Sequence, residues 1–257
     1  TLDAISGGRV MWGVGRGITI TELGGFGVAP ETTRQVFKER IVELRRILED
    51  GRFSRDGETY ELNPQSRALH DQGWMAAVSP ESFDLAAELE LDVLTGPFKP
   101  WPMIKLDLKR YRRLRPEGTT SYTMALYCEP NHEHARRRAG PGILWAYRRI
   151  LDIVRPMLAR QVVGYEHYRK LGWVAPLPEK TLSLGVMEAM GLAAVGGPDH
   201  VAHRLGKLSA AGLDRVSLVL GGGDLTAAET TACLELLSNE VLPRVHAAPP
   251  ANIRVPT

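Results

Sequence analysis

Cysteine, net charge and long apolar runs are all scarce in this sequence, and each scarcity excludes a class of protein. The two cysteines, Cys128 and Cys233, lie far apart without C-x-x-C or mixed Cys/His spacing, so they predict neither a disulfide framework nor a zinc site. A net charge of +2 is too small to indicate a nucleic-acid partner. No apolar run approaches the roughly 20 residues of a membrane-spanning helix. We therefore expect no nucleic-acid or membrane partner and, by default, a cytoplasmic location.

What is present is the composition of an ordinary soluble globular chain, 44% hydrophobic and 24% charged over 257 residues. No charged and apolar leader opens the sequence. The first residue is Thr1 rather than methionine, so we expect the natural protein to begin upstream.

Apolar strands and amphipathic helices alternate along the chain, which is the pattern of βαβ units around a parallel sheet. Five strands are predicted, at Val10–Gly15, Trp74–Val78, Asp92–Gly96, Tyr122–Cys128 and Arg215–Leu220. Helices are predicted at about 30–49, from residue 79 onward, at 104–114, over most of 131–190, and from the last strand to about 245. Asp56-Gly57 predicts a hairpin turn. Such a chain forms an open doubly wound sheet or a (β/α) barrel, and in both the chemistry lies at the carboxyl ends of the strands.

Five blocks of the sequence stand in the order and spacing of a known family. They are LDAISGGRVMWGVGRG, FGVAPETTRQVFKERIVELRRIL, FSRDGETYEL, AAVSPESFDLAAELELDVLTG, and VGGPDHVAHRLGKLSAAGLDRVSLVL with EVLPRV. Together they resemble the bacterial-luciferase-like flavin monooxygenases. The resemblance implies a (β/α)8 TIM barrel of which this chain holds five βα units, strands four to eight, with strands one to three before Thr1. We expect a single incomplete barrel domain over residues 1–247, a helical insertion at about 131–190 and a flexible tail at 248–257.

The resemblance also implies a cofactor site. In luciferase-like enzymes the positions that match Arg16, Arg34, Ser79 and Ser82 contact flavin phosphate or ring, so we expect these four residues to bind the phosphate of flavin mononucleotide (FMN). Forked guanidinium groups, hydroxyls and helix starts are the donors that a phosphate dianion requires. Val78 stands where the luciferases proper have a carboxylate, so a backbone contact is possible there but a carboxylate role is not.

Two glycines complete the expected site, and a structural interpretation competes with the functional one. Gly15 and Gly17 would let the backbone approach a flat ring, and the local spacing is not the G-x-G-x-x-G of Rossmann proteins. Without a ligand, Arg16 could pair with a nearby glutamate, Arg34 could be a solvated surface residue, and Ser79 could be a simple helix N-cap.

The function implied by the resemblance is monooxygenation. Reduced FMN, supplied by a separate flavin reductase, would react with O2 to form a flavin C4a-hydroperoxide that oxygenates a small organic substrate, in a dimeric enzyme. The acid or base of the reaction would lie on the strands before Thr1, so no catalytic residue is assigned. Two alternatives stay open: a coenzyme F420-dependent hydride-transfer oxidoreductase of the same superfamily, and a non-catalytic flavin-binding partner subunit.

Other motifs predict structure rather than chemistry. His132–His134 and His200–His203 have metal-compatible spacing without a third ligand block, so we expect capping or solvated histidines and no metal. The basic run Lys109–Arg115 predicts a helix with Leu106, Tyr111 and Leu114 inward, and Arg136–Arg138 predicts a solvent-facing helix surface. Aromatic residues between 139 and 178 predict either the wall of a substrate lid or a helical core; they are Trp145, Tyr147, Tyr165, Tyr168 and Trp173.

Overall fold

A computed structural model describes residues 1–65, 67–159, 182–220 and 223–247 of the chain. Two sheets are present in these residues, a six-stranded parallel sheet and a two-stranded hairpin. The parallel sheet consists of β1 (Trp12–Val14), β4 (Gly73–Ala76), β5 (Asp92–Thr95), β6 (Thr120–Cys128), β7 (Ala193–Gly196) and β8 (Arg215–Leu220). The hairpin consists of β2 (Arg52–Arg55) and β3 (Glu58–Glu61), joined at Asp56-Gly57 as predicted.

Helices follow most strands of the parallel sheet. In the first half they are α1 (Leu2–Ser6), α2 (Ile20–Gly25), the short 3-10 turn η1 (Pro30–Thr32), α3 (Thr33–Asp50), η2 (Arg67–Asp71), α4 (Pro80–Glu88) and α5 (Trp101–Leu114). In the second half they are α6 (His132–Ala159), α8 (Leu184–Ala189), α9 (Pro198–Ala210), α10 (Ala227–Leu236), the π-helical turn η4 (Leu237–Val241) and α11 (Leu242–Ala247). The expected insertion lies partly, and the expected C-terminal tail entirely, outside the described residues.

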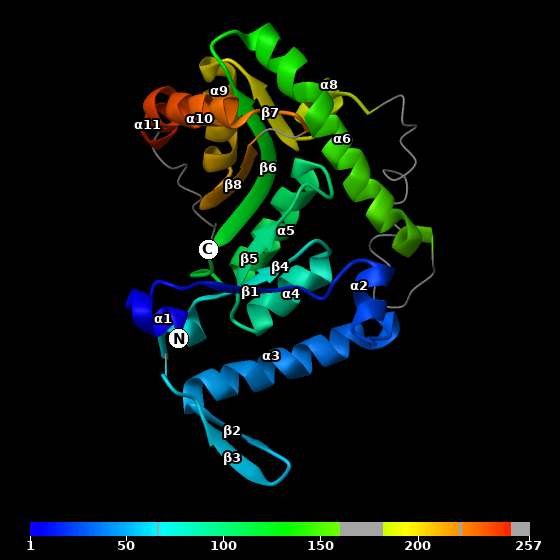
Figure 1. The fold of residues 1–257 in the computed structure, drawn as a ribbon, viewed down its shortest axis with the longest axis vertical. Helices are drawn as coiled ribbons and strands as arrows, with labels where there is room; N and C mark the ends of the chain where they lie inside the picture. The colour runs from blue at the N-terminus through cyan, green and yellow to red at the C-terminus, as the bar shows by residue number, and fades with distance from the viewer. Residues whose placement is uncertain (66, 160–181, 221–222, 248–257) are drawn as a thin grey trace.

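The parallel sheet is curled into half a barrel. The strands follow chain order through β1, β4, β5 and β6, and β6 then has partners on both edges. β8 pairs with residues 121–126 of β6, so β5 and β7 must share its other edge, at residues 120–122 and 125–128. Figure 1 shows β6 as a long curved strand with β7 and β8 beside it. The five predicted strands are therefore confirmed, and the curled parallel sheet is that of an α/β barrel, as predicted.

One strand, β7, was not predicted. Its sequence AAVG is short and consists of small residues, so it has neither the alternation of a half-buried strand nor strong β-propensity. All four residues are buried, because β7 lies between β6 and the helices α6, α8 and α9. Tertiary packing, rather than a local preference, makes this segment a strand.

The concave face of the sheet is open in the described residues. Exposure alternates along β8, where Arg215, Ser217 and Val219 are exposed and the residues between them are partly buried. Strand register connects this row, through Ser121 of β6, to the exposed side chains of Leu94 and Ala76. The opposite face carries the core that packs against the helices; it includes Met75, Val93, Tyr122, Met124 and Leu126.

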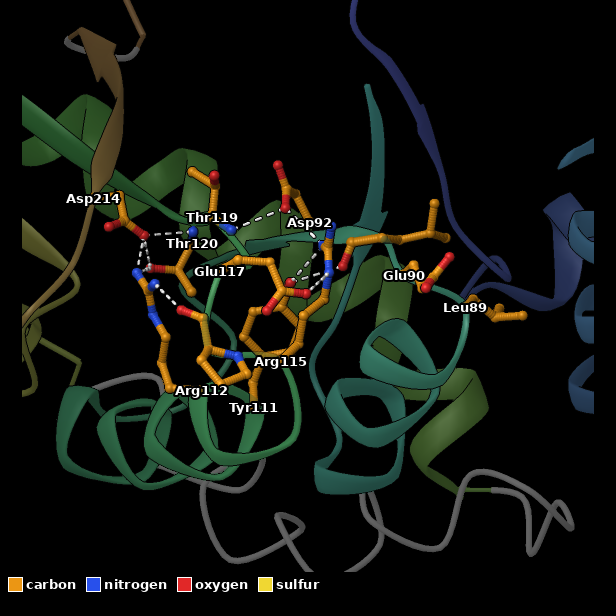
Figure 2. A network of polar contacts seen from close by, with 12 residues as sticks. Leu89, Glu90, Asp92, Tyr111, Arg112, Arg115, Glu117, Thr119, Thr120 and Asp214 are labelled. Carbon is orange, nitrogen blue, oxygen red and sulfur yellow. Dashed lines mark hydrogen bonds and ion pairs between the residues drawn. The ribbon is translucent and has the colours of Figure 1, made fainter. Parts of the chain in front are cut away.

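A polar network joins the amino ends of three strands (Figure 2). At the start of β5, Asp92 accepts a backbone N–H bond from the residue before β6 at 2.9 Å and a bond from Arg115 at 2.8 Å. Before β8, Asp214 accepts from both the N–H and the hydroxyl of Thr120 at 2.7 Å and pairs with Arg112. Each carboxylate thus fixes the start of one strand to its neighbour, at the end of the sheet opposite to the one that carries the active site in barrel enzymes.

Helix α5 departs from the expected packing. Tyr111 is fully buried, as predicted, but Leu106 and Leu114 are 68% and 57% exposed. The buried stripe consists instead of Ile104, Asp107, Leu108 and Tyr111, at the i, i+3, i+4, i+7 spacing of one helix face. Within the described residues, no helix combines the length and the hydrophobicity needed to cross a bilayer.

Candidate functional site

Three predicted residues lie at the exit of β1. Gly15 follows the strand directly beside β4, so close that a β-carbon at Gly15 would lie 3.4 Å from the β-carbon of Ala76. Gly17 has φ +79°, a left-handed conformation that favours glycine, and an added β-carbon would crowd Glu22 at 3.1 Å. Arg16 stands between the two glycines and is half-buried. Sequence reasoning therefore placed this turn correctly at the carboxyl edge of the sheet.

Two further predicted residues form a buried hydroxyl pair at the start of α4. Ser79 is the N-cap of this helix and accepts a bond from the backbone N–H of Ser82 at 3.3 Å. The two hydroxyl oxygens lie 3.0 Å apart, and both residues are buried. Pro80 occupies the first helical position, where its missing N–H costs nothing. The N-cap interpretation of Ser79 is thus confirmed, and it is compatible with an additional role toward an anion at the same helix end.

Arg34 is the second residue of α3 and is half-buried. It follows the 3-10 turn η1, which the hydroxyl of Thr33 ties down by donating to the carbonyl of Pro30 at 2.8 Å. The start of α3 is therefore well defined. The role of Arg34 toward a phosphate stays a prediction.

Sequence reasoning missed a buried ion pair next to Ser79. Lys99, in the loop after β5, is 1% exposed; it donates to the carboxylate of Asp107 and to the backbone carbonyl of Val78. The carbonyl of Val78 therefore binds an internal lysine, and a backbone contact from Val78 to the cofactor stays a prediction. A signal was available in the sequence, because Asp107 falls on the apolar stripe of α5 and a buried carboxylate requires a partner.

The concave face differs between its two ends. Near the amino ends, the Arg215 guanidinium lies 5.2 Å from the ring centre of Trp74 and donates to the sulfur of Met11 at 3.4 Å. Toward the carboxyl ends the exposed positions include Gly15 and Ala76, which have little or no side chain. Large side chains thus occupy this face near the amino ends of β4 and β8, whereas the neighbouring positions Gly15 and Ala76 carry small ones.

Arg137 of α6 is exposed, as predicted, but the arginines on either side of it bind carboxylates near the carboxyl ends of β7 and β8. Arg136 binds the buried carboxylate of Glu188, which also accepts from the N–H of Val195 at 3.1 Å. Arg138 binds Glu229 through two nitrogens, the second at 2.9 Å. Since the side chains of both arginines are only about a quarter exposed, at 25% and 24%, they are structural links rather than a solvated surface.

Residues of the two histidine motifs also lie near the carboxyl end of β7. His200 lies 2.9 Å from Glu188, and His132 accepts a bond at 3.3 Å from the N–H of Gly197, the N-cap of α9. The capping role expected for these motifs is confirmed at His132. No group of three or more His, Cys, Asp or Glu side chains in the described ranges is arranged to hold a metal ion.

The expected aromatic lid is only partly described. Tyr147 of α6 is buried in the core, whereas Trp145 is 58% exposed. The three other aromatic residues of that prediction, Tyr165, Tyr168 and Trp173, lie outside the described residues.

The curled parallel sheet defines a barrel-type α/β protein, and small, hydroxylic and basic residues lie at its carboxyl edge. Comparison with known proteins identifies the family as well as the fold class. The family described as luciferase-like monooxygenase matches residues 1–215, and the chain belongs to this family. The relationship to this family, which the sequence blocks indicated, is confirmed.

Individual relatives are more distant. An uncharacterised protein, y4wF, of Sinorhizobium fredii is 37% identical over 93 residues, which cover 34% of this chain and 27% of that relative. The monooxygenase RslO1 of Streptomyces bottropensis is 22% identical with a TM-score of 0.73, over 96% of this chain and 71% of its own. An F420-dependent secondary alcohol dehydrogenase, solved with an F420-acetone adduct, is 16% identical with a TM-score of 0.62, over 95% of this chain and 72% of its own. The two structures establish the fold.

Proposed function

We propose that this chain belongs to a flavin-dependent monooxygenase that uses reduced FMN and O2 to oxygenate a small organic substrate. Family membership supports an oxidoreductase, and members of this superfamily use flavins or F420. The observation that carries the proposal is the buried pair of hydroxyls, Ser79 and Ser82, at the first turn of α4, one strand away from the Gly15-Arg16 exit.

The residues present fit FMN. Its terminal phosphate carries close to two negative charges and requires several charge-assisted donors. The hydroxyls of Ser79 and Ser82 and the guanidinium groups of Arg16 and Arg34 are donors of this kind, and the positive end of the α4 dipole adds to their field. The near absence of side chains at Gly15 and beside it at Ala76 leaves space for the flat ring system.

FMN, when bound in its reduced form, supplies the electrons that activate O2. The chain's own residues would anchor the phosphate, orient the ring over the small side chains of β1 and β4, and exclude water from the reacting face. A separate flavin reductase would supply the reduced cofactor. A cytoplasmic location and a dimeric assembly remain part of the proposal.

A second candidate is F420-dependent hydride transfer, which the structural similarity to an F420-dependent dehydrogenase favours. The two cofactors differ in charge at the anchoring group, since FMN ends in a phosphate monoester whereas the F420 phosphate is a diester. A non-catalytic flavin-binding subunit would bind FMN and leave the reaction of reduced FMN with O2 at the rate that it has in free solution.

Binding and turnover together test the proposal. The purified protein is titrated with FMN, riboflavin and F420, and oxygen consumption is then followed with reduced FMN. We expect tight FMN binding, weaker riboflavin binding, and oxygen consumption that depends on the protein. Preference for F420 would support the hydride-transfer alternative. FMN binding with oxygen consumption no faster than that of free reduced FMN would support the silent subunit.

A further inference from the structure

A lysine is buried behind the proposed phosphate site. Lys99 lies three residues after Gly96, in the loop between β5 and α5, and only 1% of its surface is exposed. Burying an ammonium group costs several kcal/mol unless charged and polar partners surround it. An internal lysine at the carboxyl edge of a barrel-type sheet therefore requires a specific reason.

Three groups surround the ammonium of Lys99. It donates to the carboxylate of Asp107, itself buried on α5, and to the backbone carbonyl of Val78, and it lies 5.3 Å from the ring centre of Phe83 on α4. Burial lowers the pKa of Lys99, and the hydrogen bond that Lys99 donates to Asp107 opposes that shift. The side chain thus connects α5, the first turn of α4 and the end of β4.

The bond to Val78 is the informative one. An apolar pair of similar volume would fill the same space without a desolvation cost, so packing alone does not explain a lysine. The carbonyl of Val78 belongs to the peptide unit that leads into the N-cap Ser79. Holding this peptide plane fixes the direction in which the Ser79 side chain leaves the backbone, and with it the hydrogen-bonded partner Ser82.

We propose that Lys99, paired with Asp107, is a positioning residue that orients the Ser79 and Ser82 hydroxyls toward the phosphate of the bound cofactor. This inference rests on the proposed function, since it assigns the phosphate to the start of α4. Lys99 touches neither hydroxyl and acts through the backbone of Val78.

The test compares affinities for FMN and riboflavin, which differ only in the phosphate. The double variant Lys99→Met/Asp107→Leu replaces the buried pair by apolar side chains, a change that folded proteins often tolerate, and it removes the bond to Val78. A matched control, Arg110→Met/Asp84→Leu, removes an ion pair that joins the same two helices at the surface. Thermal unfolding verifies that each variant is folded, and fluorescence quenching gives both affinities.

We expect the first double variant to lose about tenfold or more in FMN affinity, the scale of a charge-assisted hydrogen bond, while riboflavin affinity stays within about twofold. The surface control should keep the FMN preference. If Lys99→Met/Asp107→Leu does not fold, Lys99→Gln/Asp107→Asn is the second variant. The glutamine side chain is one atom shorter than that of lysine and carries no charge, so it loses the charge-assisted bond to Val78 and the same loss is expected.

Retention of the full FMN preference in either folded variant would overturn the positioning role while leaving the proposed function in place. A protein without substitutions that binds FMN no better than riboflavin would contradict the phosphate site itself, and with it both proposals. The two failures are therefore distinguishable in one data set.

Discussion

At the scale of single residues, one close neighbour can determine which side chain a position accepts. Gly118, in the turn before β6, is such a residue, because a β-carbon there would lie 2.2 Å from the hydroxyl oxygen of Tyr111. That hydroxyl is buried and donates to the carbonyl of Leu91 at 2.8 Å, so it has no free space into which to move.

Gly118→Ala is therefore expected to destabilise the protein by about 1–3 kcal/mol, the usual cost of overpacking a well-filled interior. Urea unfolding measures the change. Gly24→Ala is the matched control, since nothing lies within 4 Å of its added β-carbon on the exposed helix α2 and alanine favours helices. Equal stability of the two variants would contradict the packing described at Tyr111.

The cysteines are also explained by their neighbours. Cys128 and Cys233 are 105 residues apart in the sequence, yet the backbone N–H of Cys128 donates to the sulfur of Cys233 at 3.2 Å and both are buried free thiols. The sequence predicted no disulfide framework, but only the fold brings the two side chains together. Burial raises the pKa of Cys128 to about 12 and also raises the pKa of Cys233.

Because the thiolate is the reactive form, both cysteines should be nearly inert toward Ellman's reagent in the native protein at pH 8 and react fully in denaturant. The colour yield over time measures this. Rapid reaction of either thiol in the folded protein would show that it is accessible, contrary to its burial.

At the scale of elements, an ion pair joins α6, the helix after β6, to α10, the helix after β8. Arg138 hydrogen-bonds Glu229, the third residue of α10, which also accepts from the N–H and hydroxyl of its capping partner Thr226. These bonds, that of Arg138 foremost, lower the pKa of Glu229 from an ordinary value of 4.5 to about 2.

A depressed carboxylate pKa gives a defined pH dependence. The stabilisation from Glu229 is fully present above pH 4.5 and is lost as the pH falls toward about 2, where the carboxylate is protonated in the folded state as well. Glu229→Gln should therefore lower the melting temperature near pH 7, and the difference from the unsubstituted protein should shrink between those two pH values. A difference in melting temperature that stays constant over this pH range would contradict the Arg138–Glu229 ion pair.

Elements with a strong local pattern could be predicted from the sequence, and elements made by tertiary contacts could not. The apolar strands, the Asp56-Gly57 hairpin and the Ser79 cap are local signals, and all are present. Strand β7 depends on its neighbours, and the pairing of Arg136 and Arg138 with distant carboxylates cannot be inferred from a run of three arginines.

The candidate site divides in the same way. Its glycines and serines lie where a strand ends or a helix begins, and Gly, Ser and Pro are typical of such positions. Their placement could therefore be predicted from the sequence. Lys99 is 21 residues from Val78 in the sequence and eight from Asp107. These contacts depend on the packing of α5 against α4, so they could not be predicted from the sequence. Asp107 on an apolar helix stripe was the one local sign of it.

At the scale of the whole molecule, the small exposed residues Gly15 and Ala76 lie on the concave face of the curled sheet, near its carboxyl edge. Ala76 is exposed on this face beside Gly15, so a larger side chain there would enter the space that we assign to the flavin ring. Ala76→Phe should therefore weaken FMN and riboflavin to a similar extent, by about tenfold or more, while the melting temperature changes little, since no core contact is altered.

Titration with both flavins measures the effect. Unchanged affinity for both would place the ring elsewhere, and a loss confined to FMN would indicate that the substitution disturbs the phosphate site instead.

The central claim is that the start of α4 and the exit of β1 bind the phosphate of the cofactor. A crystal structure of the protein with FMN tests it most directly. The account predicts phosphate oxygens within about 3 Å of the Ser79 and Ser82 hydroxyls and of the Arg16 guanidinium. A phosphate bound at the carboxyl ends of β6 and β8, away from these three side chains, would contradict it.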